Sequence, residues 1–167
     1  MNINRETRFR DFHGYSLVEL IVVMLFVGAL ALIAIPRMNY GLIKKGRAEV
    51  SAYKFSMDLQ RARSLAIMNA STHPDGYAIV LTGGSPYEGY KIFDVTNMTD
   101  VEEFEFNGSV NCTSTIGYGI SGLPAMVFGP LGNVTNGDGE ISFSDDQGNS
   151  YVVSVVASTG MTSISEN

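Results

Sequence analysis

An unbroken apolar run from Tyr15 to Ile35 places the strongest constraint on what this chain can fold into. The run is 21 residues long and contains one acidic or basic side chain, that of Glu19. At a rise of about 1.5 Å per residue, a helix of this length spans roughly 31 Å, close to the hydrocarbon thickness of a bilayer. The sequence therefore predicts a transmembrane helix over residues 15–35.

The polar residues 1–14 before this run do not read as an ordinary secretory signal. Such a signal has a shorter apolar core, and a cleavage site of small residues follows it. Here the small residue, Gly14, precedes the apolar run. Cleavage at Gly14 would therefore leave the apolar helix as the new N-terminus.

The segment from Gly14 to Val23 reads glycine, aromatic, hydroxyl, two aliphatics, glutamate and then an aliphatic run. This order resembles the class III signal of type IV prepilins and type II secretion pseudopilins. The resemblance implies that residues 1–14 are a leader, which a prepilin peptidase removes by cutting between Gly14 and Tyr15 before it methylates the amino group of Tyr15. It also implies a single-pass protein of the bacterial inner membrane, with a periplasmic C-terminal domain, that enters a filament after cleavage.

The charged side chain of Glu19 is unfavourable inside such a helix unless it has a partner. A carboxylate inside a membrane helix costs about 2.5–3.5 kcal/mol or more, so it needs a partner or a proton. Cleavage before Tyr15 would create a cation at nearly the same depth. We expect Glu19 of one subunit to meet the amino terminus of its neighbour in a filament, which makes Glu19 the assembly residue.

The helical pattern continues beyond the apolar run. Six small or apolar residues are spaced alternately four and three apart, which places them on one helical face: Ala48, Ala52, Phe55, Leu59, Ala62 and Ala66. Residues 36–70 are therefore predicted to be an amphipathic continuation of one helix that runs from Tyr15 to about Ala70. Pro36, Gly41 and Gly46 weaken the middle of this helix, where a bend is expected.

Residues 71–167 carry strand patterns instead of helical ones. Short runs of β-branched and aromatic residues alternate with turns rich in glycine, asparagine and proline. The predicted strands are 77–81, 90–94, 101–106, 125–128, 140–143, 151–156 and 161–164. The predicted fold class is thus α+β, in which a long N-terminal helix, transmembrane in its first half, packs on an antiparallel β-sheet or small sandwich as in pilins.

Two further segments extend the resemblance. The segment from Asp58 to Ile67 resembles the leucine–alanine–arginine signature of the minor pseudopilin family that contains GspH and FimT. The segment from Val127 to Gly132, with Ser158-Thr159-Gly160, is similar to that family's C-terminal pattern. The resemblance implies a minor pseudopilin that helps to initiate or cap a type II secretion pseudopilus. Its implied partners are other pilin or pseudopilin subunits, the prepilin peptidase, the inner-membrane assembly platform and membrane lipid.

Two alternative functions stay open at this point. One is a minor type IV pilin of a pilus or of a DNA-uptake (competence) system. The other is a signal-anchored module that only receives DNA or a secreted ligand. DNA binding is disfavoured, because the chain from Ser64 onward has one base, Lys91, and twelve acids, a net charge of −11 that repels phosphate. Gly160 is also followed by no arginine, unlike the DNA-binding members of the family.

The sequence offers little material for catalysis or metal binding. It has one cysteine, Cys112, and two histidines, His13 and His73. His73 is expected to be a buried or capping residue, and Cys112 a small apolar or loop residue. The oxygen-rich segments 133–140 and 145–149 are explained by hairpin turns as well as by calcium. We expect no enzyme activity, no catalytic residue, no metal site and no cofactor.

Overall fold

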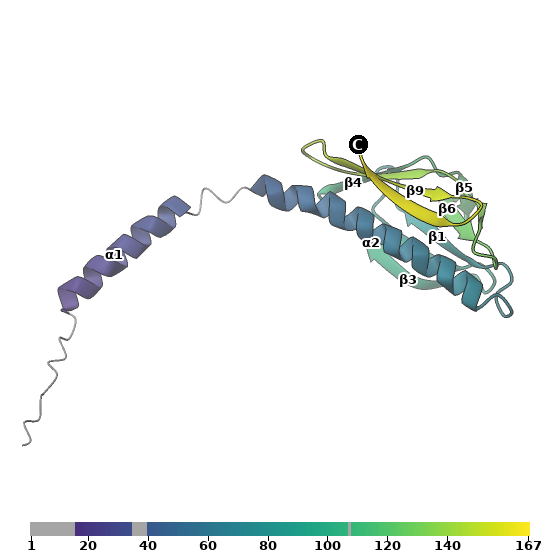
Figure 1. Cartoon of the computed structure of the whole chain (residues 1–167), viewed down its shortest axis with the longest axis horizontal. Coiled ribbons are helices and arrows are strands. Elements are labelled where there is room, and N and C mark those ends of the chain that lie inside the picture. The colour runs from purple at the N-terminus through teal and green to yellow at the C-terminus, as the bar shows by residue number, and fades with distance from the viewer. Residues whose placement is uncertain (1–15, 35–39, 107) are drawn as a thin grey trace, which may run out of the picture. The chain divides into compact units, whose positions relative to one another are not determined.

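A computed structural model describes residues 16–34, 40–106 and 108–167, and the helices and strands among them are shown in Figure 1. The chain divides into two compact units, Met1–Asn39 and Tyr40–Asn167. The first unit contains helix α1 (Leu17–Ala34), and the second contains helix α2 (Tyr40–Met68) and all the described strands. Among the described residues, no helix is both long and apolar enough to cross a membrane.

The second unit contains two antiparallel sheets. The six-stranded sheet has the order β3-β2-β1-β6-β5, with β7 also paired to β6, and the four-stranded sheet has the order β10-β9-β8-β4. The strands are β1 (Tyr77–Thr82), β2 (Gly89–Asp94), β3 (Thr99–Glu105), β4 (Val110–Ser114), β5 (Tyr118–Ile120), β6 (Leu123–Phe128), β7 (Val134–Asn136), β8 (Glu140–Asp145), β9 (Ser150–Val156) and β10 (Met161–Glu166).

The predicted fold class is therefore wrong. In place of one long helix, transmembrane in its first half and packed on an antiparallel sheet or small sandwich, the described residues form two separate helices and ten strands in two sheets. The folded second unit is mostly β. Helix α1 ends at Ala34, two residues before Pro36, and α2 begins at Tyr40. Helices usually end at or before the residue that precedes a proline.

The core of the second unit is built on the predicted face of α2. All six residues of the stripe from Ala48 to Ala66 are fully buried, as predicted. They pack against apolar side chains from both sheets, among them Ile79 and Phe128 of the larger sheet and Phe143 of the smaller one. The small alanines let the strands approach the helix closely, while Phe55 and Leu59 fill the space between the sheets.

The seven predicted strand segments are all found, with boundaries that differ by a few residues. Strands β4, β5 and β7 were not predicted. In β4, the buried Val110 and Cys112 alternate with exposed polar residues, so a strand with few apolar residues was overlooked. Strands β5 and β7 have three residues each, which is too short for a clear alternation.

Candidate functional site

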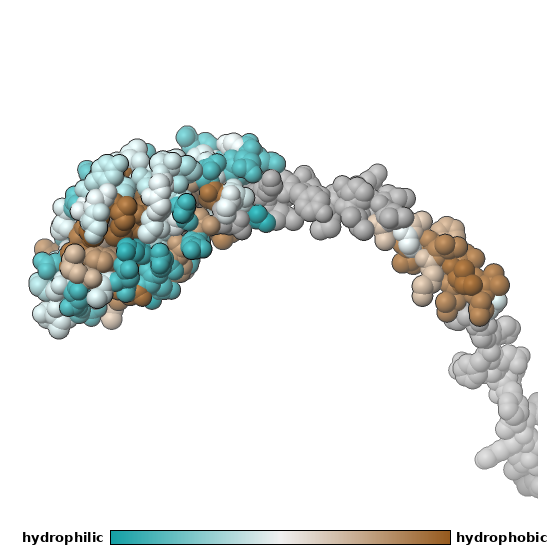
Figure 2. Space-filling view, turned by 180° about the vertical axis from the view of Figure 1, so that it is seen from behind, coloured by the Kyte–Doolittle hydropathy of each residue, from teal (hydrophilic) through white to brown (hydrophobic). Residues whose placement is uncertain are grey.

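Helix α1 exposes apolar side chains around its whole circumference. Every described side chain from Ser16 to Ala31 is exposed, and Figure 2 shows the described surface of α1 brown almost throughout, whereas the β-rich unit is mostly teal and white. A helix that is hydrophobic all round is normally buried in a large core or in lipid. The first unit therefore presents a surface that requires a cover of lipid or of other protein chains.

Glu19 lies in the first turn of α1 and is exposed among these apolar side chains. A carboxylate at this position is favoured by the positive end of the helix dipole. The predicted cleavage residues, Gly14 and Tyr15, lie outside the described residues. The predicted pairing of Glu19 with the amino group of Tyr15 therefore stays a prediction.

The outer face of α2 carries a second exposed apolar stripe, which the sequence analysis did not single out. Val50, Tyr53 and Met57 are 67%, 54% and 66% exposed, and their spacing of three and four residues places them on one side of the helix. The inner stripe drew attention because it is longer and more regular. The spacing of the outer residues was visible in the sequence and is the signal that would have revealed them.

A buried carboxylate joins the inner side of α2 to the larger sheet. Asp58 is 3% exposed and accepts hydrogen bonds from the Tyr90 hydroxyl and from Lys54 Nζ, which lies 3.1 Å from Asp58 Oδ1. Burial, followed by the hydrogen bond to Asp58, raises the pKa of Tyr90 above its ordinary value of 10.0. Tyr90 therefore stays a neutral donor. A charge with two partners inside a packed core points to a structural role.

Ion pairs connect α2 along its own length and to the larger sheet. Lys54 pairs with Asp58, one turn along the helix, at 3.0 Å. Arg61, also correctly spaced to reach Asp58, instead pairs with Glu102 of β3. In the N-terminal half of α2, Arg47 Nη1 donates to Ser109 Oγ at 3.1 Å.

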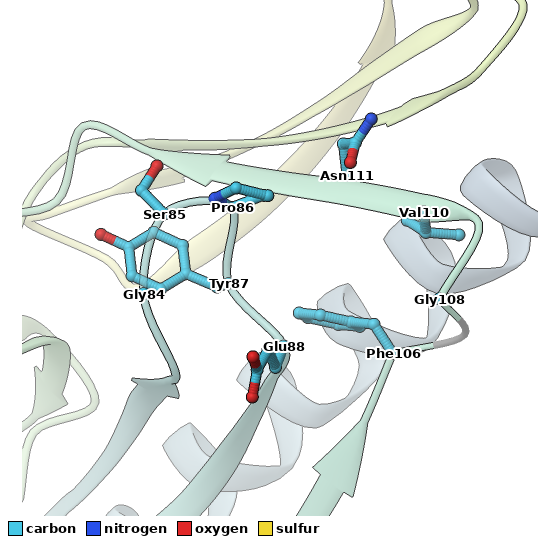
Figure 3. Close-up of a pocket in the computed structure, with 9 residues that line it drawn as sticks. All are labelled: Gly84, Ser85, Pro86, Tyr87, Glu88, Phe106, Gly108, Val110 and Asn111. Carbon is cyan, nitrogen blue, oxygen red and sulfur yellow. The ribbon is translucent and has the colours of Figure 1, made fainter.

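The loop between β1 and β2 borders a cavity of about 460 Å³ (Figure 3). Phe106 and Tyr87 supply aromatic surface, and Glu88 supplies one carboxylate. The Tyr87 backbone N–H donates to the Cys112 carbonyl at 2.8 Å, which ties this loop to β4. The lining of the cavity thus combines aromatic surface with one carboxylate and the hydroxyls of Ser85 and Tyr87.

His73 is held by polar contacts that connect neighbouring elements, which points to a structural role. His73 Nε2 is 3.1 Å from Asp94 Oδ2, and its Nδ1 is 2.7 Å from Thr72 Oγ1. The same threonine hydroxyl donates to the Asn69 carbonyl at 3.2 Å. These contacts join the end of α2 to the turn after β2.

Asp94 organises that turn. Burial alone would raise the pKa of Asp94, but hydrogen bonds from the side chain and backbone of Asn97, the neighbouring His73 and the Thr96 N–H outweigh it and hold the pKa below its ordinary value. The carboxylate is therefore occupied by its own loop, which is the pattern of a turn-forming Asp.

The described residues contain no group of three or more His, Cys, Asp or Glu side chains that could hold a metal ion. In the segment considered for calcium, Asp145 Oδ1 accepts from the N–H groups of Gln147 and Asn149, and its Oδ2 accepts from Asn149 Nδ2. Cys112 is buried on β4, and burial raises the pKa of its thiol to about 12.

Comparison of the chain with protein-family models, with curated proteins and with solved structures finds no match.

Proposed function

We propose that this protein is a minor pseudopilin, a structural subunit without enzyme activity that helps to initiate or cap a type II secretion pseudopilus. The observation that carries this proposal is the prepilin-like segment from Gly14 to Val23, in which Glu19 is the one charged residue of an exposed, otherwise apolar helix. A free-standing apolar helix has no use in an isolated soluble domain. In a filament, the same surface packs against the helices of other subunits.

The second unit supplies the outward-facing domain in this proposal. Its core is formed by α2 and both sheets. Its described polar clusters, such as that around Asp58, are occupied by internal hydrogen bonds. These features support a role in subunit contact and give no support to turnover of a substrate.

The proposed life of the subunit has two stages. It is first held in the bacterial inner membrane with its C-terminal domain in the periplasm, where a prepilin peptidase removes residues 1–14 and methylates Tyr15. It then joins other pilin or pseudopilin subunits through the assembly platform. Glu19 favours the subunit in the filament over the isolated subunit in the membrane, because pairing with a neighbour's amino terminus removes the free-energy cost of an unpaired charge among apolar side chains.

The test of this proposal is Glu19→Leu in the bacterium that makes the protein. The variant should remain in the membrane fraction but be missing from sheared filaments, because the apolar surface is kept and the pairing charge is lost. Leu20→Met, at an adjacent exposed position, is the matched control and should enter filaments normally. Wild-type incorporation of Glu19→Leu would contradict the proposed role of this carboxylate.

A further inference from the structure

Strand β10 forms one edge of the four-stranded sheet, and this edge is long and regular. It pairs with β9 over six consecutive residues, from Met161 opposite Val156 to Glu166 opposite Tyr151, without a bulge. Its other side has no strand partner among the described residues. An edge of this kind presents backbone donors and acceptors in the spacing that an incoming strand needs.

The alternation of hydrogen bonds identifies which backbone groups face outward. The Asn167 N–H donates to the Ser150 carbonyl at 2.9 Å. In an antiparallel pair, hydrogen-bonded and non-hydrogen-bonded positions alternate, so Ser165 and Ser163 also bond to β9. Thr162 and Ile164 occupy the alternate positions, and their N–H and C=O groups point away from the sheet.

The other edges of the described sheets are protected. Strand β3 carries four acids, Asp100, Glu102, Glu103 and Glu105, and its pairing with β2 is interrupted by a register shift. Strand β4 is bridged on its open side by Tyr87, which pairs with Cys112. Strands β5 and β7 have three residues each. Charges, bulges and short strands are the usual means by which proteins block strand addition.

Strand β10 lacks those devices along most of its length. It contains no lysine, arginine or proline, and its one acid, Glu166, is its last residue. Its outer face instead carries Met161, 63% exposed, which lies opposite Val156, 53% exposed. This pair forms a small apolar step beside the open edge, where an apolar side chain of an added strand would pack.

A cavity of about 390 Å³ lies between α2 and the start of β10. It is lined by Gln60, Arg63, Gly160, Met161 and Thr162. Arg63 Nε donates to the Gly132 carbonyl at 3.0 Å, which fixes the guanidinium beside the start of β10. No acidic side chain of the described residues forms an ion pair with Arg63. A guanidinium fixed in this way is suited to receive a carboxylate.

Charge identifies the kind of strand that fits. The chain from Ser64 onward carries a net charge of −11, whereas α2 carries several bases, and Arg63 is the one that lies beside the start of β10. A second copy would bring the same excess of acid against this edge. A segment of another protein with a single acid between apolar residues avoids that repulsion and matches both faces of the edge.

From this geometry we infer that the open edge of β10 binds an extended segment of another protein chain by strand addition. The added strand hydrogen-bonds to the backbones of Thr162 and Ile164. It places a carboxylate on Arg63 and an apolar side chain against Met161 and Val156. This edge works in the same way whether or not the chain assembles into a filament.

The probe for this inference is a fluorescein-labelled peptide, GTVEVTVG, whose valines share one face and whose glutamate lies on the other. Fluorescence anisotropy with the full-length protein in a mild detergent should show saturable binding. Thr162→Pro removes both the outward N–H and the side-chain hydroxyl of this residue. Thr162→Val removes only the hydroxyl and keeps the N–H, so the two variants differ in that one backbone donor. We expect Thr162→Pro to bind at least about fivefold more weakly than Thr162→Val, the effect of one hydrogen bond. Equal binding by the two variants would overturn strand addition at β10.

The carboxylate contact is tested by exchanging both partners. Replacing the peptide glutamate by glutamine should weaken binding about fivefold or more to the wild type, and should have little effect on Arg63→Gln. Equal binding of the two peptides by the wild type would overturn the role of Arg63.

Hydrogen exchange provides a measurement that needs no variant. The amides of Thr162 and Ile164 should exchange more slowly when the peptide is bound, while those of β3 should not change. Unchanged exchange at saturating peptide would overturn the inference even if Thr162→Pro fails to fold. Sedimentation that shows a peptide-free dimer, dissociated by Thr162→Pro, would assign this edge to a second copy and overturn the choice of partner.

Discussion

Tyr90→Phe tests how the core holds the buried carboxylate of Asp58. The Tyr90 ring is almost completely buried and packs against Phe55, Phe104 and Phe106 at centroid distances of 4.9, 5.2 and 5.5 Å. Phenylalanine keeps these contacts and removes only the hydroxyl. The substitution therefore isolates the hydrogen bond to Asp58.

The expected loss follows from the charge of the acceptor. A hydrogen bond to a charged group contributes about 1.5–3 kcal/mol, more than a neutral one. Asp58 keeps Lys54 as a partner, but the Lys54 side chain is 48% exposed and cannot replace the hydroxyl on the buried side. For a unit of this size, such a loss lowers the melting temperature by about 5–15 °C.

The effect should also depend on pH in a defined direction. Because the folded state raises the pKa of Tyr90 above 10.0, the unfolded chain releases this proton first as the pH rises. Stability from the Tyr90 hydroxyl is then complete below pH 10 and is lost above it. The difference between wild type and variant should be constant from pH 7 to 9 and about 0.8 kcal/mol smaller at pH 10.5.

Denaturant unfolding of the full-length protein, followed by circular dichroism, measures both effects. Tyr53→Phe is the matched control, because this tyrosine is exposed on the same helix and its loss should change stability by less than about 0.5 kcal/mol. Equal stability of Tyr90→Phe and Tyr53→Phe would refute the assigned importance of the Asp58 hydrogen bond. A difference that grows above pH 10 would refute the direction of the pKa shift.

Three further results are expected. The thiol of Cys112, whose pKa burial raises to about 12, should not react with a disulfide reagent at pH 8 until denaturant is added, and rapid reaction of the native protein would contradict its burial. Gly160→Ala should lower the free energy of unfolding by about 2–4 kcal/mol, because the backbone has φ +65° and the new Cβ would lie 2.1 Å from the Gly132 carbonyl oxygen. Gly148→Ala is the control, because this glycine has φ +87° but open space around it, and it should lower the free energy of unfolding by about 1–2 kcal/mol. An equal loss at both sites would contradict the contact with Gly132. Asp94→Asn should destabilise the protein most above pH 5 and least below the carboxyl's ordinary pKa of 3.8, since a lowered pKa gives stability that is lost on acidification; a pH-independent difference in unfolding free energy would argue against this.

The sequence predicted those parts of the fold that depend on local periodicity. The alternating spacing from Ala48 to Ala66 identified the buried face of α2, and the β-branched runs identified seven strands. The prediction of one long helix was wrong, because the apolar run before Pro36 and the stripe that begins at Ala48 were joined into a single helix with only a bend between them. The spacing of apolar residues predicts the buried face of a helix, whereas prolines and glycines determine where the helix ends.

The contacts of the candidate surfaces depend on residues far apart in the chain, which no local pattern reveals. Asp58 and Arg61 lie three residues apart on α2, a spacing that allows an ion pair, but Asp58 is turned into the core toward Tyr90, and Arg61 reaches Glu102 instead. The open edge of β10 is likewise a property of sheet order. Its residues predicted a strand but could not show which side of that strand has no partner.

The amino terminus of the mature protein tests the proposed function most directly. Mass spectrometry of the protein from its own bacterium should find a chain that begins at N-methylated Tyr15, and Gly14→Val should leave residues 1–14 attached, because the peptidase must fit a residue without a side chain beside the bond that it cuts. A wild-type chain that retains residues 1–14, or one cut at any other bond, would contradict the assignment of this protein as a pseudopilin.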